Sequence, residues 1–428
     1  MSSIQKLKTL SFLVYGLGRT GLSVISFFKR NKIRNFKVWD DNNKNFLKDK
    51  RPDNLLRALR ETNFIILSPG VSLKTSANRN HLIKYKNKII TDIDLIFLQK
   101  KFFKSIVITG TNGKSTTSKI IDHTLKKNGY KTLLGGNIGL PILNLNIKKD
   151  HFLIIEASSF QLSHSKFISP DYALLLNLSN DHLDWHGNMK DYENSKFKIF
   201  KHQNKNQYSL INKKLKDKFK KRNLLGKLIL PRLSNYQKVK SKIKNSYLIS
   251  DMNNENMSFV FALIKLLGIN QKSFFKSLKT FKGMPHRYEI FLKRKNCIFI
   301  NDSKATSFQA TKCALENTKN IFWIVGGQPK KNDKFNVKKF KKDIVKTYII
   351  GKNINFFKIR IRNDLNFFIA KSLKNSIIEI FKDIKKFKKK TNTILLSPAS
   401  ASFDQYSDFE KRGDEFKRLS KNYASKYL

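Results

Sequence analysis

The chain has 428 residues, enough for two or three domains, and its apolar content of 40% with 12% aromatic residues excludes an intrinsically disordered protein. A formal charge of +55 taken alone would favour a nucleic acid or an anionic membrane surface as partner, but lysine far outnumbers arginine and lies along the whole chain. We interpret the charge as a surface bias beside anionic substrates, and expect no nucleic-acid partner and no membrane partner.

The cellular compartment follows from the cysteines and from the first residues. Only Cys297 and Cys313 occur, without CxxC or metal-binding spacing, which is typical of a reducing compartment. The first 30 residues do not resemble a secretory signal, because Gly16, Gly18 and Gly21 interrupt the apolar run. We expect a cytoplasmic, monomeric protein.

Strand-like apolar runs alternate with helical segments from end to end, which predicts an α/β fold built on parallel sheets. The first unit has predicted strands at 11–16, 35–40 and 63–70 and a helix over 20–30. The second unit opens at 105–117 and has further strands at 151–159 and 172–182. The lysine-rich stretch 201–245 has the least pattern, and we predict surface elements there. The third unit begins near Met284, with strands at 297–303, 321–327, 347–351 and 393–400. The predicted domains are 1–92, 93–283 and 284–428.

A glycine pattern, GLGRTG, follows the first predicted strand, and Asp40 ends the second. This spacing is typical of dinucleotide-binding turns, in which the acidic residue binds a ribose hydroxyl. Either NAD or the nucleotide portion of a substrate fits this pattern.

A second glycine loop, GTNGKST, runs from Gly110 to Thr116 between a strand and a helix. Such a loop turns its backbone N–H groups towards phosphate, and the helix dipole adds to the attraction. Lys114 is placed to reach the β- and γ-phosphates, and the Ser115 hydroxyl to hold Mg²⁺. The glycine spacing departs from that of GTPases and common ATPases.

Polar residues also follow other strands, where ligands bind in open α/β sheets. Glu156 and His182 end two strands of the second unit and could complete a metal site, although a helix-capping role for His182 stays open. Arg287, in MPHRYE, and Lys304, in NDSKAT, open the third unit and suit phosphate or carboxylate binding.

Taken together, these segments resemble the Mur ligase family over nearly the whole chain. The resemblance rests on TGTNGKST, on Glu156 to Ser159, on the Asn-x-x-Asn at Asn253 to Asn256, and on the pair His286 and Arg287, all in family order. It implies a Rossmann-like N-terminal domain, a central P-loop ATPase-like domain and a Rossmann-like C-terminal domain.

Within the family, three segments look like those of the members that add D-glutamate. They are GGNIG, NDSKAT and LSPASASFDQYSDFEKRG, which begin at Gly135, Asn301 and Leu396. The resemblance implies ATP-dependent ligation of D-glutamate to UDP-N-acetylmuramoyl-L-alanine through an acyl phosphate, with ATP and Mg²⁺ as cofactors. The product would serve peptidoglycan synthesis, and so cell-wall biogenesis and cell division.

The resemblance also implies a role for each matching residue. Catalysis would involve Lys114, His182 and Lys196, the last at the family position of a carbamylated lysine. The metal ligands would be Ser115, Glu156, His182 and carbamylated Lys196. ATP would contact Gly110, Thr111, Asn112, Gly113, Lys114, Ser115, Thr116, Asn256, Arg287 and Asp302. The UDP-substrate would contact Arg19, Thr20, Asp40, Ser68, Gly70, Asn137 and Ser158. D-Glutamate would contact Lys304, Thr306, Lys330, Ser402 and Phe409.

Three positions depart from the family pattern. Met252 replaces a histidine, Ser307 replaces an asparagine after NDSKAT, and Arg19 replaces an apolar residue of the first glycine loop. None of these changes removes a charge that the reaction needs. The first two bear on how adenine and glutamate are held.

Three other functions would each fit part of the sequence. A folylpolyglutamate-type ligase shares the phosphate loop, but GLGRTG and SPASASFDQY argue against it. A basic nucleic-acid-binding NTPase would explain the charge, yet clustered basic and aromatic residues are lacking. An NAD oxidoreductase would leave the phosphate loop unexplained.

Overall fold

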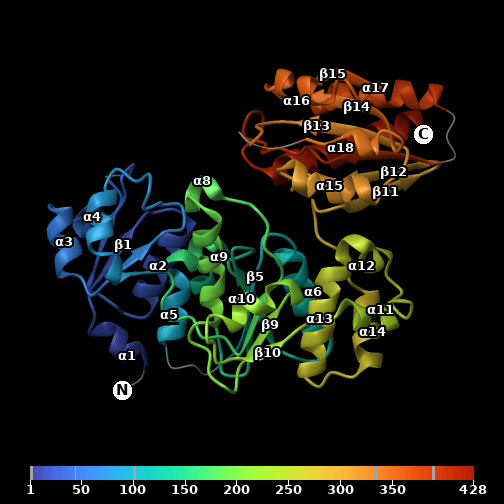
Figure 1. Cartoon of the computed structure of the whole chain (residues 1–428). Helices are drawn as coiled ribbons and strands as arrows, with labels where there is room; N and C mark the ends of the chain where they lie inside the picture. The colour runs from blue at the N-terminus through green and yellow to red at the C-terminus, as the bar shows by residue number, and fades with distance from the viewer. Residues whose placement is uncertain (1–2, 44, 100–102, 331–332, 334, 388–390) are drawn as a thin grey trace. The chain divides into compact units, whose positions relative to one another are not determined.

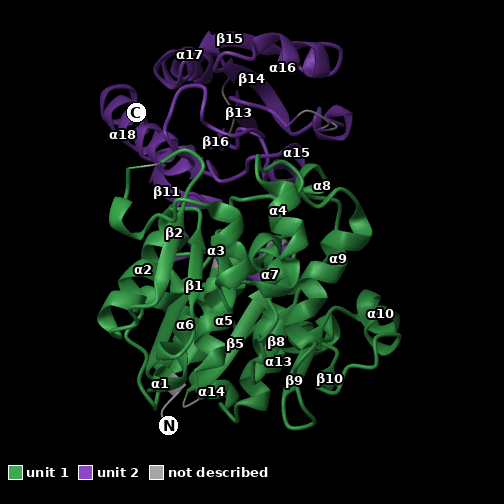
Figure 2. Cartoon of the chain, turned by 90° about the vertical axis from the view of Figure 1, so that its left-hand side faces the viewer, with its two compact units in different colours: residues 1–245, 253–281 green, residues 246–252, 282–428 purple. Residues whose placement is uncertain are grey.

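The computed structural model describes residues 3–43, 45–99, 103–330, 333, 335–387 and 391–428. The chain divides into two compact units, one formed by residues 1–245 and 253–281 and the other by residues 246–252 and 282–428 (Figure 2). Both units consist of helices packed on largely parallel sheets (Figure 1).

The first sheet of unit 1 is parallel, with strand order β2-β1-β3-β4. Its strands are β1 Phe12–Tyr15, β2 Phe36–Trp39, β3 Phe64–Leu67 and β4 Ile89–Ile90. The helices of this part are α1 Ser3–Lys8, α2 Arg19–Arg30, α3 Leu55–Glu61, α4 Arg79–Lys84 and α5 Asp92–Leu98. Helix α2 buries Val24, Ile25 and Phe28, at the three- and four-residue spacing of one helix face, in the core that includes Phe12 and Val14 of β1.

The second sheet of unit 1 has six parallel strands in the order β10-β9-β8-β5-β7-β6. Its strands are β5 Lys104–Thr109, β6 Thr132–Gly136, β7 Phe152–Glu156, β8 Tyr172–Leu175, β9 Tyr208–Ile211 and β10 Lys227–Ile229. The helices are α6 Lys114–Lys127, α7 Ser159–His164, α8 Leu183–His186, α9 Met189–Phe197, α10 Lys216–Lys220, α11 Leu233–Lys240, α13 Asn254–Leu266 and α14 Gln271–Lys279.

The stretch 201–245 differs from its prediction as surface elements only. It supplies β9 and β10, and β9 lies inside the sheet between β8 and β10 with Leu210 and Ile211 fully buried. The apolar run of β9 has only four residues with polar residues on both sides, so periodicity could not separate it from a loop.

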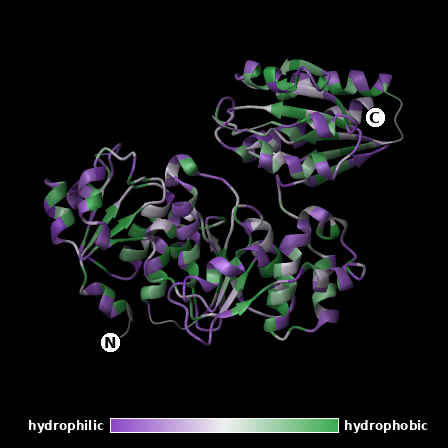
Figure 3. Cartoon of the chain, in the orientation of Figure 1, coloured by the Kyte–Doolittle hydropathy of each residue, from purple (hydrophilic) through white to green (hydrophobic). Residues whose placement is uncertain are grey.

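The sheet of unit 2 has the order β11-β12-β16-β13-β14-β15, and only the pairing of β11 with β12 is antiparallel. Its strands are β11 Glu289–Arg294, β12 Cys297–Asn301, β13 Ile321–Gly326, β14 Ile344–Ile350, β15 Phe367–Lys371 and β16 Asn392–Leu396. The helices are α12 Ser246–Ile249, α15 Phe308–Glu316, α16 Ile354–Ile361, α17 Leu373–Lys386 and α18 Phe409–Tyr427. The strands are largely hydrophobic, whereas the helices alternate polar and apolar positions (Figure 3).

The predicted α/β class with three sheet regions is confirmed. The domain boundaries at 92 and 283 stay predictions. Across the described ranges, none of the helices combines the length and the apolar character that crossing a membrane requires.

Candidate active site

The loop GTNGKST connects β5 to α6, and its backbone conformation favours glycine at one position. Gly113 is the N-cap of α6 with a φ of 82°, in the left-handed region. A Cβ on Gly113 would lie 2.1 Å from Oδ1 of Asn256 in α13. The loop therefore requires glycine here both for its backbone conformation and for the close approach of Asn256, a predicted ATP contact.

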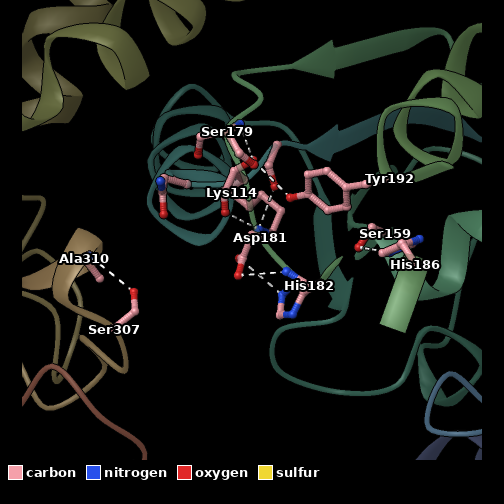
Figure 4. Close-up of polar contacts among 12 residues, drawn as sticks. Lys114, Ser159, Ser179, Asp181, His182, His186, Tyr192, Ser307 and Ala310 are labelled. Carbon is pink, nitrogen blue, oxygen red and sulfur yellow. Dashed lines mark hydrogen bonds and ion pairs between the residues drawn. The ribbon is translucent and has the colours of Figure 1, made fainter. Parts of the chain in front are cut away.

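Contacts hold the loop from within, from the segment after β8 and from α9. Nζ of Lys114 donates to the carbonyls of Gly110 and Thr111, both at 2.8 Å. The Thr111 hydroxyl accepts from the N–H of Ser179 at 3.0 Å and lies 3.0 Å from the hydroxyl of Tyr192 (Figure 4). The loop is thus closed around its carbonyls before any phosphate binds.

Lys196, in α9, lies directly behind this loop. The side chain is 1% exposed, and Nζ donates to the carbonyl of Gly110 at 2.8 Å. Burial, reinforced by repulsion from Lys114, lowers the pKa of Lys196 well below that of an ordinary lysine. The amine is therefore available in its neutral form, the form that reacts with CO₂.

Glu156 ends β7, which pairs with β5 beside the loop. The residue is 1% exposed, and Oε1 accepts from Nδ2 of Asn137 at 2.7 Å. Oε2 is buried, and among the residues that the structure describes it has no hydrogen-bond partner. An orphaned carboxylate oxygen is costly in a protein interior and suits a hard cation such as Mg²⁺.

The residues present fit Mg²⁺ better than a metal held entirely by protein. In the part of the chain that the structure describes, no three His, Cys, Asp or Glu side chains form a metal-binding group. Mg²⁺ is commonly held by one or two carboxylates, water and substrate phosphates, so a single buried carboxylate beside a phosphate loop is sufficient.

His182 is the N-cap residue of α8, as the capping alternative expected, but its side chain makes no capping hydrogen bond. Nε2 lies 3.3 Å from Oδ2 of Asp181 (Figure 4), and the centre of the ring lies 4.7 Å from that of the Phe160 ring. Nearby His186 is buried, and Nε2 lies 3.0 Å from the Ser159 hydroxyl. Burial lowers the pKa of His186 to about 4, so this second histidine is neutral at physiological pH.

Ser158 has a local structural role that its motif did not reveal. Its hydroxyl accepts from the N–H of Gln161 at 3.2 Å and completes a capping box at the start of α7. The predicted contact of Ser158 with the UDP-substrate stays a prediction.

The first glycine loop is built for close packing. Gly16 has a φ of 91°, and a Cβ on Gly21 would lie 2.0 Å from the Gly16 carbonyl. The Ser68 hydroxyl donates to that same carbonyl at 2.6 Å. Asp40 accepts from the N–H of Leu17 at 2.7 Å. Burial opposes ionisation of Asp40, but bonds from Leu17 and two further backbone N–H groups keep its pKa below its usual range.

Three other predicted UDP-substrate residues lie in this loop or near it. Arg19 is exposed and donates from Nη2 to the carbonyl of Gly139 at 3.1 Å, which links α2 to the GGNIG segment. Thr20 is half-buried in the first turn of α2, and Gly70 is exposed after β3.

Sequence reasoning missed Asp41, which organises the same end of the sheet. Its carboxylate accepts from Tyr15, Trp39 and Asn78 at 2.8–2.9 Å. Three donors scattered over more than 60 residues leave no sequence pattern that could have identified it.

In unit 2, Asp302 follows β12 and accepts from the N–H of Tyr288 at 3.1 Å and the Ser397 hydroxyl at 2.7 Å. Burial raises the pKa of Asp302 to about 7, although the bonds from Ser397 and Tyr288 and the charge of Arg287 oppose this shift. Arg287 lies half-buried on the turn before β11.

The predicted D-glutamate residues of unit 2 lie in the loops that follow its strands, except Phe409, which is the first residue of α18. Lys304 lies with Nζ 3.9 Å from the centre of the Phe409 ring, and Ser402 is buried. Thr306 is half-buried, and Lys330 is exposed. The structure brings Lys304 and Phe409 into contact.

Ser307, one of the three departures, is the N-cap of α15 and accepts from the N–H of Ala310 (Figure 4). Serine and asparagine are both favourable N-caps, so the change conserves this local role.

Arg412 of α18 is a second residue that sequence reasoning missed. It is 1% exposed and donates from Nη2 to the carbonyls of Ser303 and Ser400, at 2.8 and 2.9 Å. This guanidinium joins the NDSKAT and SPASAS loops, which are distant in the sequence.

Comparison with known proteins adds the relationship of the whole chain. The Mur ligase middle domain matches residues 108–266, and the Mur ligase MurD-like N-terminal domain matches residues 10–90. Proteins named UDP-N-acetylmuramoylalanine--D-glutamate ligase are similar: that of Rickettsia felis is 32% identical, covering 96% of this chain and 97% of its own length. That of Buchnera aphidicola is 35% identical, with coverage of 96% and 97%.

Among solved structures, MurF from Acinetobacter baumannii superposes with a TM-score of 0.60 at 13% identity, covering 99% of this chain and 98% of that one. At that identity the likeness concerns the fold alone. The family models and the full-length relatives carry the assignment, and the chain belongs to the Mur ligase family.

Proposed function

We propose that this chain ligates D-glutamate to UDP-N-acetylmuramoyl-L-alanine, converting ATP to ADP and phosphate. The observation that carries the proposal is the GTNGKST loop with Glu156 and Lys196 buried beside it, in a chain similar over nearly its whole length to ligases of that name. The reaction belongs to peptidoglycan precursor synthesis and therefore to cell-wall growth.

The chemistry explains why ATP is needed. A carboxylate resists attack by an amine, because its charge repels the nucleophile and oxide is a poor leaving group. Transfer of the γ-phosphoryl group from ATP to the carboxylate of the alanyl substrate gives an acyl phosphate. The amine of D-glutamate attacks the acyl carbon, and the tetrahedral intermediate collapses to the amide with release of phosphate. The protein contributes mainly positioning and neutralisation of charge.

The loop residues Gly110 to Thr116 and Asn256 would bind ATP together with Arg287 and Asp302, and Lys114 would neutralise the transferring phosphate. To reach phosphate, Nζ of Lys114 must leave the carbonyls of Gly110 and Thr111, which it occupies here. Arg19, Thr20, Asp40, Ser68, Gly70, Asn137 and Ser158 would bind the UDP-substrate.

The residues that would hold Mg²⁺ are Ser115, Glu156, His182 and carbamylated Lys196. When bound, the ion supplies charge neutralisation on the phosphates. Carbamylation would convert the buried amine of Lys196 into an anion with two hard oxygen atoms. The lowered pKa of this amine supports the modification, because only the neutral form reacts with CO₂.

D-Glutamate would be held in unit 2 by Lys304, Thr306, Lys330, Ser402 and Phe409. Two cations and two hydroxyls suit two carboxylates at a fixed separation. L-Glutamate would direct its amine wrongly, and D-aspartate would leave one cation unpaired. An unpaired buried polar group costs on the order of 1–3 kcal/mol, so we expect discrimination of about tenfold to a few hundredfold.

The test is phosphate release with ATP and UDP-N-acetylmuramoyl-L-alanine against a panel of amino acids that includes both glutamate enantiomers and D-aspartate. Release that depends on D-glutamate is expected. Comparable turnover with L-glutamate would contradict the proposed specificity. Release without any amino acid, but stimulated by DNA, would favour the basic NTPase instead. Mass analysis of the product would identify the amide. We also expect a monomeric, cytoplasmic enzyme.

A further inference from the structure

Glu255 is a half-buried carboxylate in the first turn of α13 that the proposed mechanism does not use. Oε2 accepts from Nδ2 of Asn177 at 2.7 Å, and Oε1 accepts from Nδ2 of Asn212. Asn177 follows β8 and Asn212 follows β9, so one carboxylate joins the carboxyl ends of two neighbouring strands to a helix.

Asn177 carries this contact to the phosphate loop. Its Oδ1 accepts from the N–H of Asn112 at 2.9 Å, and its Nδ2 donates to the carbonyl of Asn112 at 3.3 Å. The N–H of Thr111 also donates to the Asn177 carbonyl at 3.0 Å. A single side-chain amide therefore holds both backbone groups of the residue at the centre of the loop.

The carboxylate of Glu255 selects the same orientation of this amide as the backbone of Asn112 does. A carboxylate accepts hydrogen bonds and donates none, so it selects the orientation in which the NH₂ group of Asn177 points towards Glu255. Oδ1 must then face the N–H of Asn112. If the amide turned over, two donors would face each other at Asn112 and two acceptors at Glu255.

The next residue in the chain contacts the other end of the same loop. Oδ1 of Asn256 lies where a Cβ of Gly113 would be and is 3.3 Å from the Thr117 hydroxyl. The first turn of α13 thus reaches Asn112 through Glu255 and Asn177, and reaches Gly113 and Thr117 through Asn256.

A half-buried anion behind a loop that binds phosphate opposes nucleotide binding through space, so its presence there points to a compensating role. Burial raises the pKa of Glu255, while bonds from Asn177 and Asn212 and the charge of Lys214 work against that shift. The helix dipole at the start of α13 also favours an anion here. We propose that Glu255 is a positioning residue for ATP, acting through the orientation of the Asn177 amide. This inference rests on the proposed use of GTNGKST as the ATP site.

The test is the affinity for Mg-ADP, measured by calorimetry on the full chain, for Glu255→Gln, Asn177→Ala and the double variant. Glutamine has the same shape but only one acceptor oxygen, so it cannot accept from both asparagines. We expect Glu255→Gln to weaken ADP binding about tenfold, and the double variant to bind no more weakly than Asn177→Ala. The KM for D-glutamate should stay within about twofold of that of the wild type, a split that general loss of structure would not produce.

Asp171→Asn is the matched control. Asp171 accepts from the N–H and hydroxyl of Ser105 at the opposite, amino end of the strands. This variant should lower the melting temperature without changing ADP affinity. Unchanged ADP affinity in Glu255→Gln, or additive losses in the double variant, would overturn the inference. A wild type that binds ADP but ligates no D-glutamate would contradict the proposed function and leave this inference standing. A wild type without nucleotide affinity would refute both.

Discussion

Unit 1 contains two strand–glycine loop–helix turns that look alike in sequence and are lined with opposite charge. GLGRTG between β1 and α2 has the Asp40 carboxylate on the N–H of Leu17. In GTNGKST, between β5 and α6, Nζ of Lys114 and Nζ of Lys196 both donate to the carbonyl of Gly110. Both helices begin at a glycine without a side-chain cap.

The difference shows that glycine spacing sets the shape of such a loop, and that the side chains behind it set its ligand. An anion bound to a loop N–H occupies the donor that phosphate would use, so the first loop suits uncharged hydroxyl or base groups of a nucleotide. The second loop has a helix N-terminus and the Lys114 side chain for phosphate. Three substitutions and one change of salt concentration test this difference between the two loops.

The largest effect is expected for Lys114→Ala in the second loop. The substitution removes the lysine charge that would neutralise the transferring phosphate. The rate of ligation should fall about a thousandfold or more. The fold should survive, because the side chain is half-buried and Nζ donates to two carbonyls of its own loop, and the unfolding free energy should change by about 0.5 kcal/mol or less. Phosphate release and thermal melting measure the two quantities, and exposed Lys119 of the same helix, changed to Ala, is the control. Activity retained in Lys114→Ala would show that ATP binds elsewhere.

The next effect is expected for Lys196→Ala, which removes the second amine behind the loop. If the lysine acts as a carbamate, activity should fall about a hundredfold and should be partly restored by acetate, which supplies a missing anion. Because the amine must be neutral to react, added bicarbonate should activate the wild type more strongly at alkaline pH. Assays with and without acetate check the first point, and bicarbonate titrations at two pH values check the second.

Lys190→Ala, on the exposed face of the same helix α9, is the control for Lys196. Lys198 is unsuitable, because it is half-buried and donates to the carbonyl of Ser163. Burial lowers its pKa to about 8. Full activity of Lys196→Ala without acetate would rule the carbamate out.

A smaller and different effect is expected for Asp40→Asn in the first loop. The KM for the UDP-substrate should rise about tenfold with the KM for ATP unchanged, and unfolding free energy should fall by about 1 kcal/mol at pH 7. The pKa of Asp40 is depressed in the folded protein, so its contribution to stability is present above the ordinary pKa of aspartate and is lost as the pH falls through the folded value. Denaturation curves of variant and wild type should therefore converge from about pH 4 downward. An equal rise in the KM for ATP would remove the distinction between the loops.

The smallest effect is expected from salt. If the charge of +55 is a surface bias, activity should change by about twofold or less between low and physiological ionic strength, because exposed charges are screened within about 10 Å. Initial rates over a series of salt concentrations check this. Tight DNA binding with a steep salt dependence would show that the charge serves a polyanion.

The α/β class, the glycine loops and the family resemblance could be predicted from the sequence alone, because they depend on local patterns. An apolar strand followed by glycine and a helical stripe is readable within about 20 residues. The strand that ends at Glu156 and the strands that end just before Ser68 and Asp302 were predicted correctly for this reason.

The burial, the pKa values and the hydrogen-bond partners of those residues depend on tertiary contacts. Strand β9 is buried because it lies inside the sheet, between β8 and β10. The pKa of Lys196 is lowered because the loop and α9 exclude water around its amine. Asp41, Arg412 and Glu255 each bind partners from distant segments, so their roles depend on contacts that no local pattern contains. Burial and hydrogen bonding are properties of the packed chain, and they determine which of many similar lysines and carboxylates is perturbed.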